Sequence, residues 1–416
     1  MYPPKTRTGP SSPPANRASR RLAFALLLLL FLALLEAAPL HGMTPDFKLE
    51  PIAFDEIEGW AKDDVAEAFP PFLRSCRETL ETGGSFRRPP AVAGARGDWL
   101  DLCRDAAALG AKAKGTDVRQ FFEKSFTPFL VRDLSRPQGL FTGYFEPEAM
   151  GDLHRHGDYT VPLYGKPPDL MAFDPHIEQR IKLRYGRMVE GEPRPYFTRR
   201  QIEEGALAGK GLEIAWLKSW ADAFFIHVQG SGRIRLPDGR VMRLAYAAKS
   251  GLPYTSIGGL LVERKEIDKS EMSMQAIRRW MDRNPETARA LMWENQSFVF
   301  FRKIAVDDPA LGPPGAQLVQ LTPLRSVAVD REIWPFGLPL WIDTELPFPS
   351  PGGSKKFRRL MIAQDTGSAI KGAVRADVFF GSGDQAAVMA GHMKSAGRMI
   401  VLLPHKIAER LKAGKP

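Results

Sequence analysis

The sequence predicts a mainly β protein that begins with helices, a fold of the α+β class. Two observations lead to this prediction. Between residues 50 and 135, apolar residues recur at intervals of three and four, which is the spacing of amphipathic helices. From about residue 139, short alternating apolar stretches are separated by Gly and Pro turns, and this pattern favours β-barrels over a doubly wound parallel sheet.

The N-terminal segment reads as an export signal. A basic, Pro- and Ser-rich leader ends at Arg20-Arg21, and about fourteen apolar residues follow from Leu22 to Leu35. This stretch is shorter than the roughly twenty residues that a spanning helix needs. We interpret residues 1–43 as a signal peptide or N-terminal anchor. We expect an exported, periplasmic protein, and leave open whether it is associated with the outer membrane or held by an uncleaved segment.

Residues 50–135 supply the predicted helices. The steps from Ile57 to Trp60 and from Val65 to Phe69 match one helical face. A Pro-, Gly- and Arg-rich loop interrupts the segment and ends the first helical stretch.

The only two cysteines, Cys76 and Cys103, lie in this helical segment. In an exported protein an even count permits a disulfide. It would close a loop of about 27 residues, worth about 3 kcal/mol if it acts through chain entropy. Two buried thiols on packed helices are the alternative, and the sequence leaves both open.

The middle of the chain predicts strands followed by helices. We expect strands over 139–147, 159–164 and 224–236, and a β-hairpin around the turn Pro237-Asp238-Gly239. Residues 271–295 have helical spacing, with Pro285 opening a second helix after Asn284. The last third is again rich in short strands.

The composition is that of a globular protein. The 416 residues suffice for two or three domains, with 44% hydrophobic and 25% charged residues. The net charge of +10 favours an anionic partner without naming it. We find no Lys/Arg stripe with a reader motif, so we expect no nucleic-acid partner. His154 and His156 have metal-like spacing but lack a third ligand, and we predict no metal site.

Two acids in the last third attract attention, Asp365 in the turn Asp-Thr-Gly-Ser and Asp377 twelve positions later. An aspartic protease needs two such turns, and the chain has one. Glycosidic-bond cleavage needs a protonated acid, and the apolar flanks Val378 and Phe379 should raise the pKa of Asp377 through burial. From spacing alone, a Gly-rich turn that happens to carry two aspartates remains an equal alternative.

Five blocks in order extend this picture: GLFTGYFEP (139–147), residues 224–259, NQSFVFF (295–301), residues 315–344 and residues 363–381. With them the chain resembles the membrane-bound lytic murein transglycosylase A family, including its C-terminal three-aspartate domain. The resemblance implies a double-psi β-barrel built from both chain ends, with a smaller β-barrel inserted and a glycan groove between them. The expected parts are the barrel's N-terminal part with helices (44–148), the insert (149–303), the barrel's C-terminal part (304–405) and a tail (406–416).

The resemblance also implies the chemistry. Such enzymes cleave the β-1,4 bond between N-acetylmuramic acid and N-acetylglucosamine of peptidoglycan, and leave 1,6-anhydro ends. Because the muramoyl C6 hydroxyl is the nucleophile, one acid suffices. The matching positions make Asp377 the catalytic acid, Asp365 its electrostatic support and Asp343 a structural third aspartate. The alternatives are a non-catalytic peptidoglycan-binding protein on the same fold and, remotely, an aspartic protease.

Other positions match groove residues of the family. We expect substrate contacts from these residues: Thr142, Gly143, Tyr144, Gln229, Gly230, Ser231, Arg233, Tyr246 and Lys371. Arg233 could meet a peptide or lactyl carboxylate, and Lys371 could hold Asp365 ionised. His227 reads as a core histidine. The lipid-attachment cysteine of well-known family members is absent near the leader, so we expect at most weak membrane association. We also expect a monomer that acts on peptidoglycan strands without a cofactor.

Overall fold

The computed structural model describes residues 47–414 except 88, 137, 307 and 348–353. The predicted signal segment, 1–43, lies outside these residues. Of the helices in the described part, none has the length and apolar character to cross a membrane.

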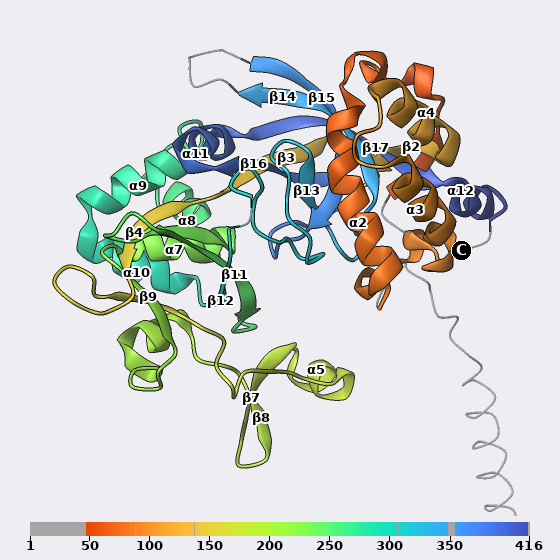
Figure 1. The fold of residues 1–416 in the computed structure, drawn as a ribbon. Coiled ribbons are helices and arrows are strands. Elements are labelled where there is room, and N and C mark those ends of the chain that lie inside the picture. The colour runs from red at the N-terminus through yellow and green to blue at the C-terminus, as the bar shows by residue number, and fades with distance from the viewer. Residues whose placement is uncertain (1–46, 88, 137, 307, 348–353, 415–416) are drawn as a thin grey trace, which may run out of the picture. The chain divides into compact units, whose positions relative to one another are not determined.

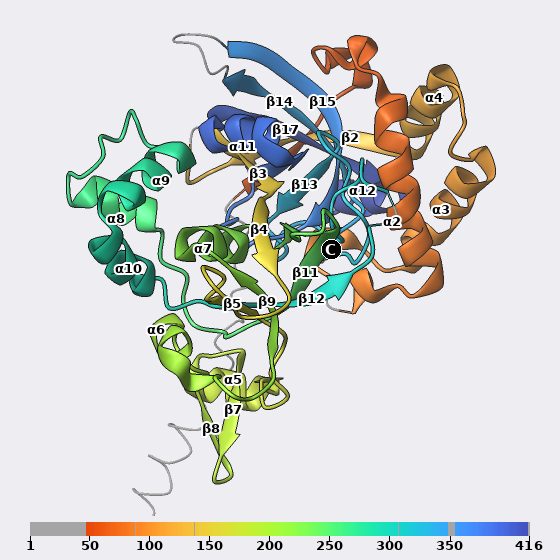
Figure 2. The ribbon, with the colours of Figure 1, turned by 60° about the vertical axis from the view of Figure 1, so that its left-hand side comes forward.

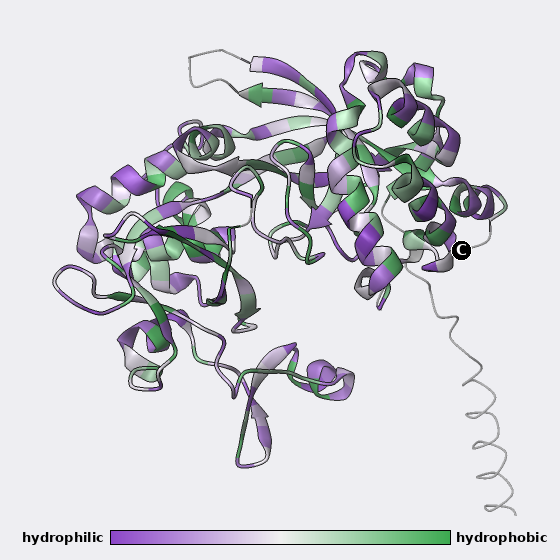
Figure 3. Cartoon of the chain, viewed as in Figure 1, coloured by the Kyte–Doolittle hydropathy of each residue, from purple (hydrophilic) through white to green (hydrophobic). Residues whose placement is uncertain are grey.

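Helices and short turns form the first part of the chain (Figure 1). They have these bounds: β1 Phe47–Pro51, the 3-10 turns Phe54–Glu56, Trp60–Lys62, Val65–Ala68, Gly84–Phe86 and Ala91–Ala93, α2 Phe69–Glu81, α3 Gly97–Leu109 and α4 Gly115–Ser125. The helical spacing from Ile57 to Phe69 thus produces 3-10 turns, and the first full helix begins at Phe69, with Pro70 and Pro71 in its first turn. Figure 3 shows hydrophilic and hydrophobic residues alternating around α2, α3 and α4.

A disulfide joins two of these helices. Cys76 of α2 and Cys103 of α3 are both buried, and their sulfur atoms are bonded. The two cysteines pack in the same hydrophobic core as Phe72 and Phe122. The bond therefore ties the helical layer together where it meets the barrel.

Eight strands form the larger sheet, in the order β1-β2-β17-β14-β15-β13-β16-β3. The strands not yet given are β2 Phe126–Asp133, β3 Gly139–Glu146, β13 Ser326–Val329, β14 Pro339–Pro347, β15 Ser354–Asp365, β16 Arg375–Ser382 and β17 Lys394–Pro404. Because β3 also pairs with β17, the six strands from β17 round to β3 close on themselves. Strands from both ends of the described chain thus build one barrel-like sheet.

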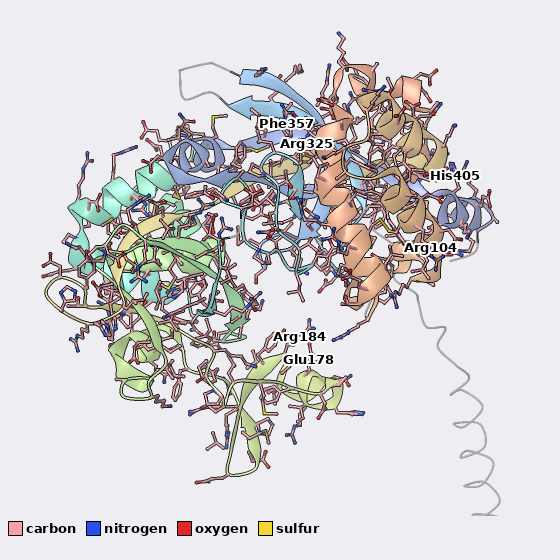
Figure 4. The ribbon with its side chains drawn as sticks, viewed as in Figure 1. Arg104, Glu178, Arg184, Arg325, Phe357 and His405 are labelled. Carbon is pink, nitrogen blue, oxygen red and sulfur yellow. A yellow bond between two sulfur atoms is a disulfide. The ribbon has the colours of Figure 1, made fainter. Side chains whose placement is uncertain are left out.

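The barrel is anchored to the N-terminal turns by a buried arginine. Arg325, labelled in Figure 4, lies just before β13. Its guanidinium contacts Asp63 and Glu67, each at 2.8 Å, and donates to the carbonyl of Leu360 at 3.0 Å. The buried charge is therefore compensated, as burial requires.

The residues between β3 and β13 form a second sheet of six strands, β12-β11-β10-β4-β9-β5. Their bounds are β4 Glu148–Asp152, β5 Val161–Tyr164, β9 Glu213–Leu217, β10 Gly232–Arg235, β11 Val241–Lys249 and β12 Val299–Ile304. An isolated bridge between Gly165 and Phe301 links the two edge strands of this sheet. The predicted hairpin is confirmed, since β10 and β11 pair antiparallel around Pro237-Asp238-Gly239.

Helices and a small sheet accompany this second sheet (Figure 2). They are β6 Met171–Ala172, α5 Pro175–Ile181, β7 Tyr185–Val189, β8 Glu192–Arg194, α6 Arg199–Gln201, a π-helical turn Ile202–Ala206, α7 Trp220–Gln229, α8 Ile257–Glu263, α9 Met274–Arg283 and α10 Pro285–Glu294. Pro285 opens α10 as predicted. The C-terminal part adds α11 Gly383–His392 and α12 His405–Lys412.

The strand predicted over 224–236 is wrong in its first half, where the chain forms α7. Ser219 caps this helix by accepting from the backbone N–H of Asp222, and Gly230 ends it in a left-handed conformation (φ 77°). A continuous apolar run fits a buried helix as well as a strand. The cap and the glycine are the signals that distinguish the two.

Candidate active site

The two aspartates singled out in the sequence lie on either side of one short strand. Asp365 is the last residue of β15, and Asp377 lies in β16. Strand β13 separates them, and its residue Ala328 is the register partner of both. Both aspartates are partly exposed, and the sheet brings the two acids together.

Asp377 has one hydrogen-bond donor among the residues that the structure describes, the hydroxyl of Thr142. Thr142 is also its register partner, because β3 runs parallel to β16. The hydroxyl in turn accepts from Arg375 Nη2 at 2.8 Å. Burial raises the pKa of Asp377 above its ordinary value, although the charge of Arg375 and the Thr142 hydroxyl act in the opposite direction.

Asp365 is held by three donors. The hydroxyl of Tyr144 and the backbone N–H groups of Ala316 and Thr366 each donate to it at 2.9 Å. Burial nevertheless raises its pKa and the nearby charge of Asp377 acts in the same direction, while the three hydrogen bonds act in the opposite direction. Burial and the charge of Asp365 also raise the pKa of Tyr144 well above its ordinary value, so the phenol remains a donor.

The two acids therefore differ in what stabilises their ionised forms. Asp365 receives three hydrogen bonds and Asp377 receives one. Hydrogen bonds to a carboxylate favour its charged form. More donors therefore stabilise the ionised form of Asp365 than that of Asp377.

Strand β3 supplies the predicted residues Thr142, Gly143 and Tyr144. The first and third point to the aspartates, as their hydrogen bonds require. Gly143, between them, leaves room on the opposite side. A Cβ here would lie 2.5 Å from the Phe380 ring and 2.8 Å from Cα of Ala390. The glycine lets β3 pass close to α11.

A buried carboxylate lies two residues beyond Tyr144 on the same strand. Glu146 is fully buried and pairs with Arg233 of β10 at 2.7 Å and Arg243 of β11 at 2.8 Å. It also accepts from the hydroxyl of Ser382, at the end of β16, at 2.7 Å. The strands that carry Thr142 and Asp377 are thereby joined to the second sheet through one side chain.

Two predicted residues do not lie where the sequence suggested. The Lys371 amine contacts Glu332 at 3.0 Å and Asp330 at 3.4 Å, and does not bond Asp365. The turn between Asp365 and Lys371 takes the amine away from Asp365. Arg233 is engaged by Glu146 and is not available as a free cation for a substrate carboxylate.

The other predicted contacts surround the end of α7. Gln229 accepts from the backbone N–H of Phe145 at 3.1 Å, Gly230 ends the helix and Ser231 is buried. Tyr246 of β11 is 44% exposed. His227 is buried among aromatic rings, and Arg199 Nη1 lies 2.9 Å from its Nδ1. Burial and the charge of Arg199 lower the pKa of His227 well below its ordinary value, which agrees with a neutral core histidine.

A cavity of about 520 Å³ adjoins this site. Thr142 and Gly143 line it from β3, Gln229 from α7 and Tyr254 from the segment after β11. Lys249, the last residue of β11, donates to the Ser368 hydroxyl of the DTGS turn at 2.9 Å. The sequence reasoning missed Tyr254 and Lys249, although both lie in the matched block 224–259. Their contacts with the cavity and with the DTGS turn depend on how the second sheet folds.

The described residues contain no group of three or more His, Cys, Asp or Glu side chains that could hold a metal ion. What the site offers is two shielded carboxyl groups, hydroxyl donors and a neighbouring cavity. Such an arrangement suits general acid chemistry on a polar ligand.

Two protein-family models match consecutive parts of the chain. The model of the MltA specific insert domain matches residues 140–302, and that of the 3D domain matches residues 325–403. The crystal structure of a membrane-bound lytic murein transglycosylase from Agrobacterium tumefaciens is 35% identical, with a TM-score of 0.78. The match covers 87% of this chain and 99% of that one. The chain belongs to the membrane-bound lytic murein transglycosylase A (MltA) family.

Other MltA proteins are also similar. Membrane-bound lytic murein transglycosylase A of Vibrio cholerae is 36% identical over 267 residues, 62% of this chain and 64% of that protein. The chain thus spans a little under two thirds of this curated relative. The crystal structure of Escherichia coli MltA with bound chitohexaose is 29% identical, with a TM-score of 0.60, and the match covers 86% of this chain and 91% of that one.

In this MltA-family chain, the third aspartate, Asp343, lies apart from the other two on β14. Its carboxylate accepts from Arg358 at 2.9 Å and from Arg398 at 2.6 Å. These bonds and the two positive charges lower its pKa, although burial acts in the opposite direction. An acid held ionised between two arginines fits a role in supporting β14, β15 and β17.

Proposed function

We propose that this chain is a lytic transglycosylase of peptidoglycan. It cleaves the β-1,4 bond between N-acetylmuramic acid and N-acetylglucosamine and forms 1,6-anhydro-N-acetylmuramic acid ends. The observation that carries the proposal is the pairing of Asp377, a shielded acid with a raised pKa, with Asp365 across Ala328. The names of the relatives and the chitohexaose bound to the Escherichia coli protein support a glycan as the substrate.

Asp377 is the proposed catalytic residue. Its proton passes to the glycosidic oxygen as the bond from that oxygen to C1 of the muramoyl residue breaks. The muramoyl C6 oxygen then bonds to C1, and its hydroxyl proton returns to the Asp377 carboxylate. No water enters the product, and the acid is regenerated. Because the nucleophile belongs to the substrate, the site needs no second carboxylate to activate water.

Asp365 supplies charge in this proposal. Positive charge develops at C1 in the oxocarbenium-like transition state, and a nearby carboxylate stabilises it. The three donors around Asp365 keep its carboxylate in a fixed orientation. Thr142 orients Asp377 in the same way.

The finer assignments are also proposals. We infer that the closed six-strand sheet is a double-psi β-barrel, formed by residues 44–148 and 304–405, and that residues 149–303 form an inserted β-barrel. The parallel pairs β13–β15 and β16–β3 and the bridge between Gly165 and Phe301 support this division. We also infer a monomer that is exported to the periplasm by residues 1–43, with weak membrane association at most.

The product of digested peptidoglycan sacculi tests the function. A lytic transglycosylase releases muropeptides with anhydro ends, and a hydrolase releases ends that have gained water. A non-catalytic peptidoglycan-binding protein, the second candidate, sediments with sacculi and releases neither. Sedimentation without any product would replace the enzymatic proposal with the binding one. An aspartic protease lacks support, because the chain carries a single Asp-Thr-Gly turn.

A further inference from the structure

The cavity beside Thr142 differs in chemistry from the site of the aspartates. It has a volume of about 520 Å³ and lies among β3, α7, α8, α9 and the end of α11, which Figures 1 and 2 both place together. Neither aspartate lines it. Thr142 lines it and also donates to Asp377, so the cavity begins next to the proposed acid.

Most of the cavity wall is apolar. Aromatic, aliphatic and methionine side chains line it: Phe224, Phe225, Ile257, Met272, Met274 and Ile277. Thr142, Gln229 and Tyr254 add polar groups to one part of the wall. The larger apolar part suits a ligand that carries small apolar groups.

Two lysines give the cavity a positive charge. Lys269 and Lys394 both line it and are exposed. In the described part of the chain, the lysines that contact a carboxylate within 4.0 Å are these: Lys218, Lys356, Lys371 and Lys406. Among the residues that the structure describes, neither Lys269 nor Lys394 therefore has a carboxylate partner. A ligand that fits this cavity combines small apolar groups with carboxylates.

We propose that the cavity receives the stem peptide attached to the lactyl group of the muramoyl residue at the scissile bond. This inference rests on the proposed function. The peptide branches from the sugar ring on which the cleaved bond ends, and it carries alanine methyl groups and free carboxylates. Its methyl groups meet the apolar wall and its carboxylates meet the two lysines, as charge complementarity requires. Peptide-bearing glycan is then the preferred substrate.

The test compares two substrates made from one preparation of glycan strands, one with its peptides and one stripped of them by an amidase. For each, kcat/KM is measured from the anhydro ends released. We expect the wild-type enzyme to favour peptide-bearing strands about tenfold, and the double variant Lys269→Gln/Lys394→Gln to remove about that tenfold preference. Val228→Trp, which places a large ring into the cavity from α7, should lower the same ratio.

Lys303→Gln is the matched control. Lys303 is an exposed lysine of β12 outside the cavity, and its loss should leave the ratio at the wild-type value. Thermal unfolding of each variant identifies a loss that comes from misfolding. The ratio between the two substrates is insensitive to the amount of folded enzyme, so a partly unfolded variant still gives an answer.

A wild-type ratio near one, or a ratio that the double variant leaves unchanged, would overturn the inference while anhydro products still support the proposed function. Laurate, added as a competitor, tests the alternative that the cavity binds acyl chains. If it competes with both substrates equally and the wild-type enzyme shows no peptide preference, the cavity binds acyl chains instead. If neither substrate yields anhydro ends, the proposed function itself fails.

Discussion

Asp365 and Asp377 are both register partners of Ala328, so a strand of four residues holds the two acids of the candidate site. Asp365 is paired to it in parallel and Asp377 antiparallel. The two aspartates are twelve positions apart in the sequence, and the closed sheet fixes their relative position.

Thr142→Val should move the alkaline limit of activity to higher pH. The Thr142 hydroxyl favours the ionised form of Asp377, so its loss raises the pKa of Asp377. A general acid works while it is protonated, so activity should then persist to higher pH. The pH dependence of kcat/KM checks this shift. Thr142→Ser keeps the hydroxyl and should keep the wild-type limit. A limit that moves to lower pH in Thr142→Val would contradict the assignment.

Tyr144→Phe should reduce kcat by about tenfold, because Asp365 loses one of three donors and part of its orientation. The fold should be retained, since the ring and its contact with Phe379 remain. Steady-state assays on purified sacculi measure the change. The backbone donors Ala316 and Thr366 remain, so a complete loss of activity would mean that Tyr144 itself takes part in proton transfer.

Glu146→Gln should destabilise the protein by about 3–5 kcal/mol, because the buried Arg243 and the partly buried Arg233 would lose their common counter-charge. Ser382→Ala removes a single neutral donor to the same carboxylate and should cost about 1 kcal/mol. Urea unfolding measures both. Equal effects of the two substitutions would show that the ion pairs contribute little.

Replacing both cysteines by serine should lower the free energy of unfolding by about 3 kcal/mol. The disulfide links α2 to α3 and restricts the unfolded chain. Unfolding in urea should show a lower midpoint for the double variant than for the oxidised wild type. If dithiothreitol lowers the wild-type midpoint to the same value, the difference comes from the bond and not from the serine side chains.

The stability of the protein should depend on the ionisation of Asp377. Its pKa is raised on folding, so the folded state binds more protons than the unfolded chain between the two pKa values, and stability falls as pH rises through this window. Asp377→Asn should therefore stabilise the protein at pH 7. The gain should disappear at a pH below the ordinary value of 3.8, where the carboxyl is protonated in both states. Urea unfolding at both pH values measures the gain.

Sequence reasoning predicted the parts of the site that lie within continuous motifs. Thr142 and Tyr144 come from GLFTGYFEP, and both reach the aspartates. Sequence reasoning failed for residues whose position depends on the three-dimensional path of the chain. Lys371 follows Asp365 closely, but the turn between them takes its amine to Asp330.

Long-range pairs were beyond the sequence alone. Glu146 and Arg243 are nearly a hundred positions apart, and only the pairing of β10 and β11 with neighbouring strands brings them together. The helix α7 was mistaken for a strand because its apolar run has no alternating polar face, and this error also hid the cavity that α7 lines.

The central claim is that Asp377 is the proton donor, and the masses of products from digested sacculi test it most directly. The wild-type protein and Asp343→Asn, the matched control on β14, should both release muropeptides one water lighter than hydrolysis products. Asp377→Asn should stay folded and release at least about a thousandfold less. Anhydro products from Asp377→Asn at the wild-type rate, or their loss in Asp343→Asn alone, would contradict the account.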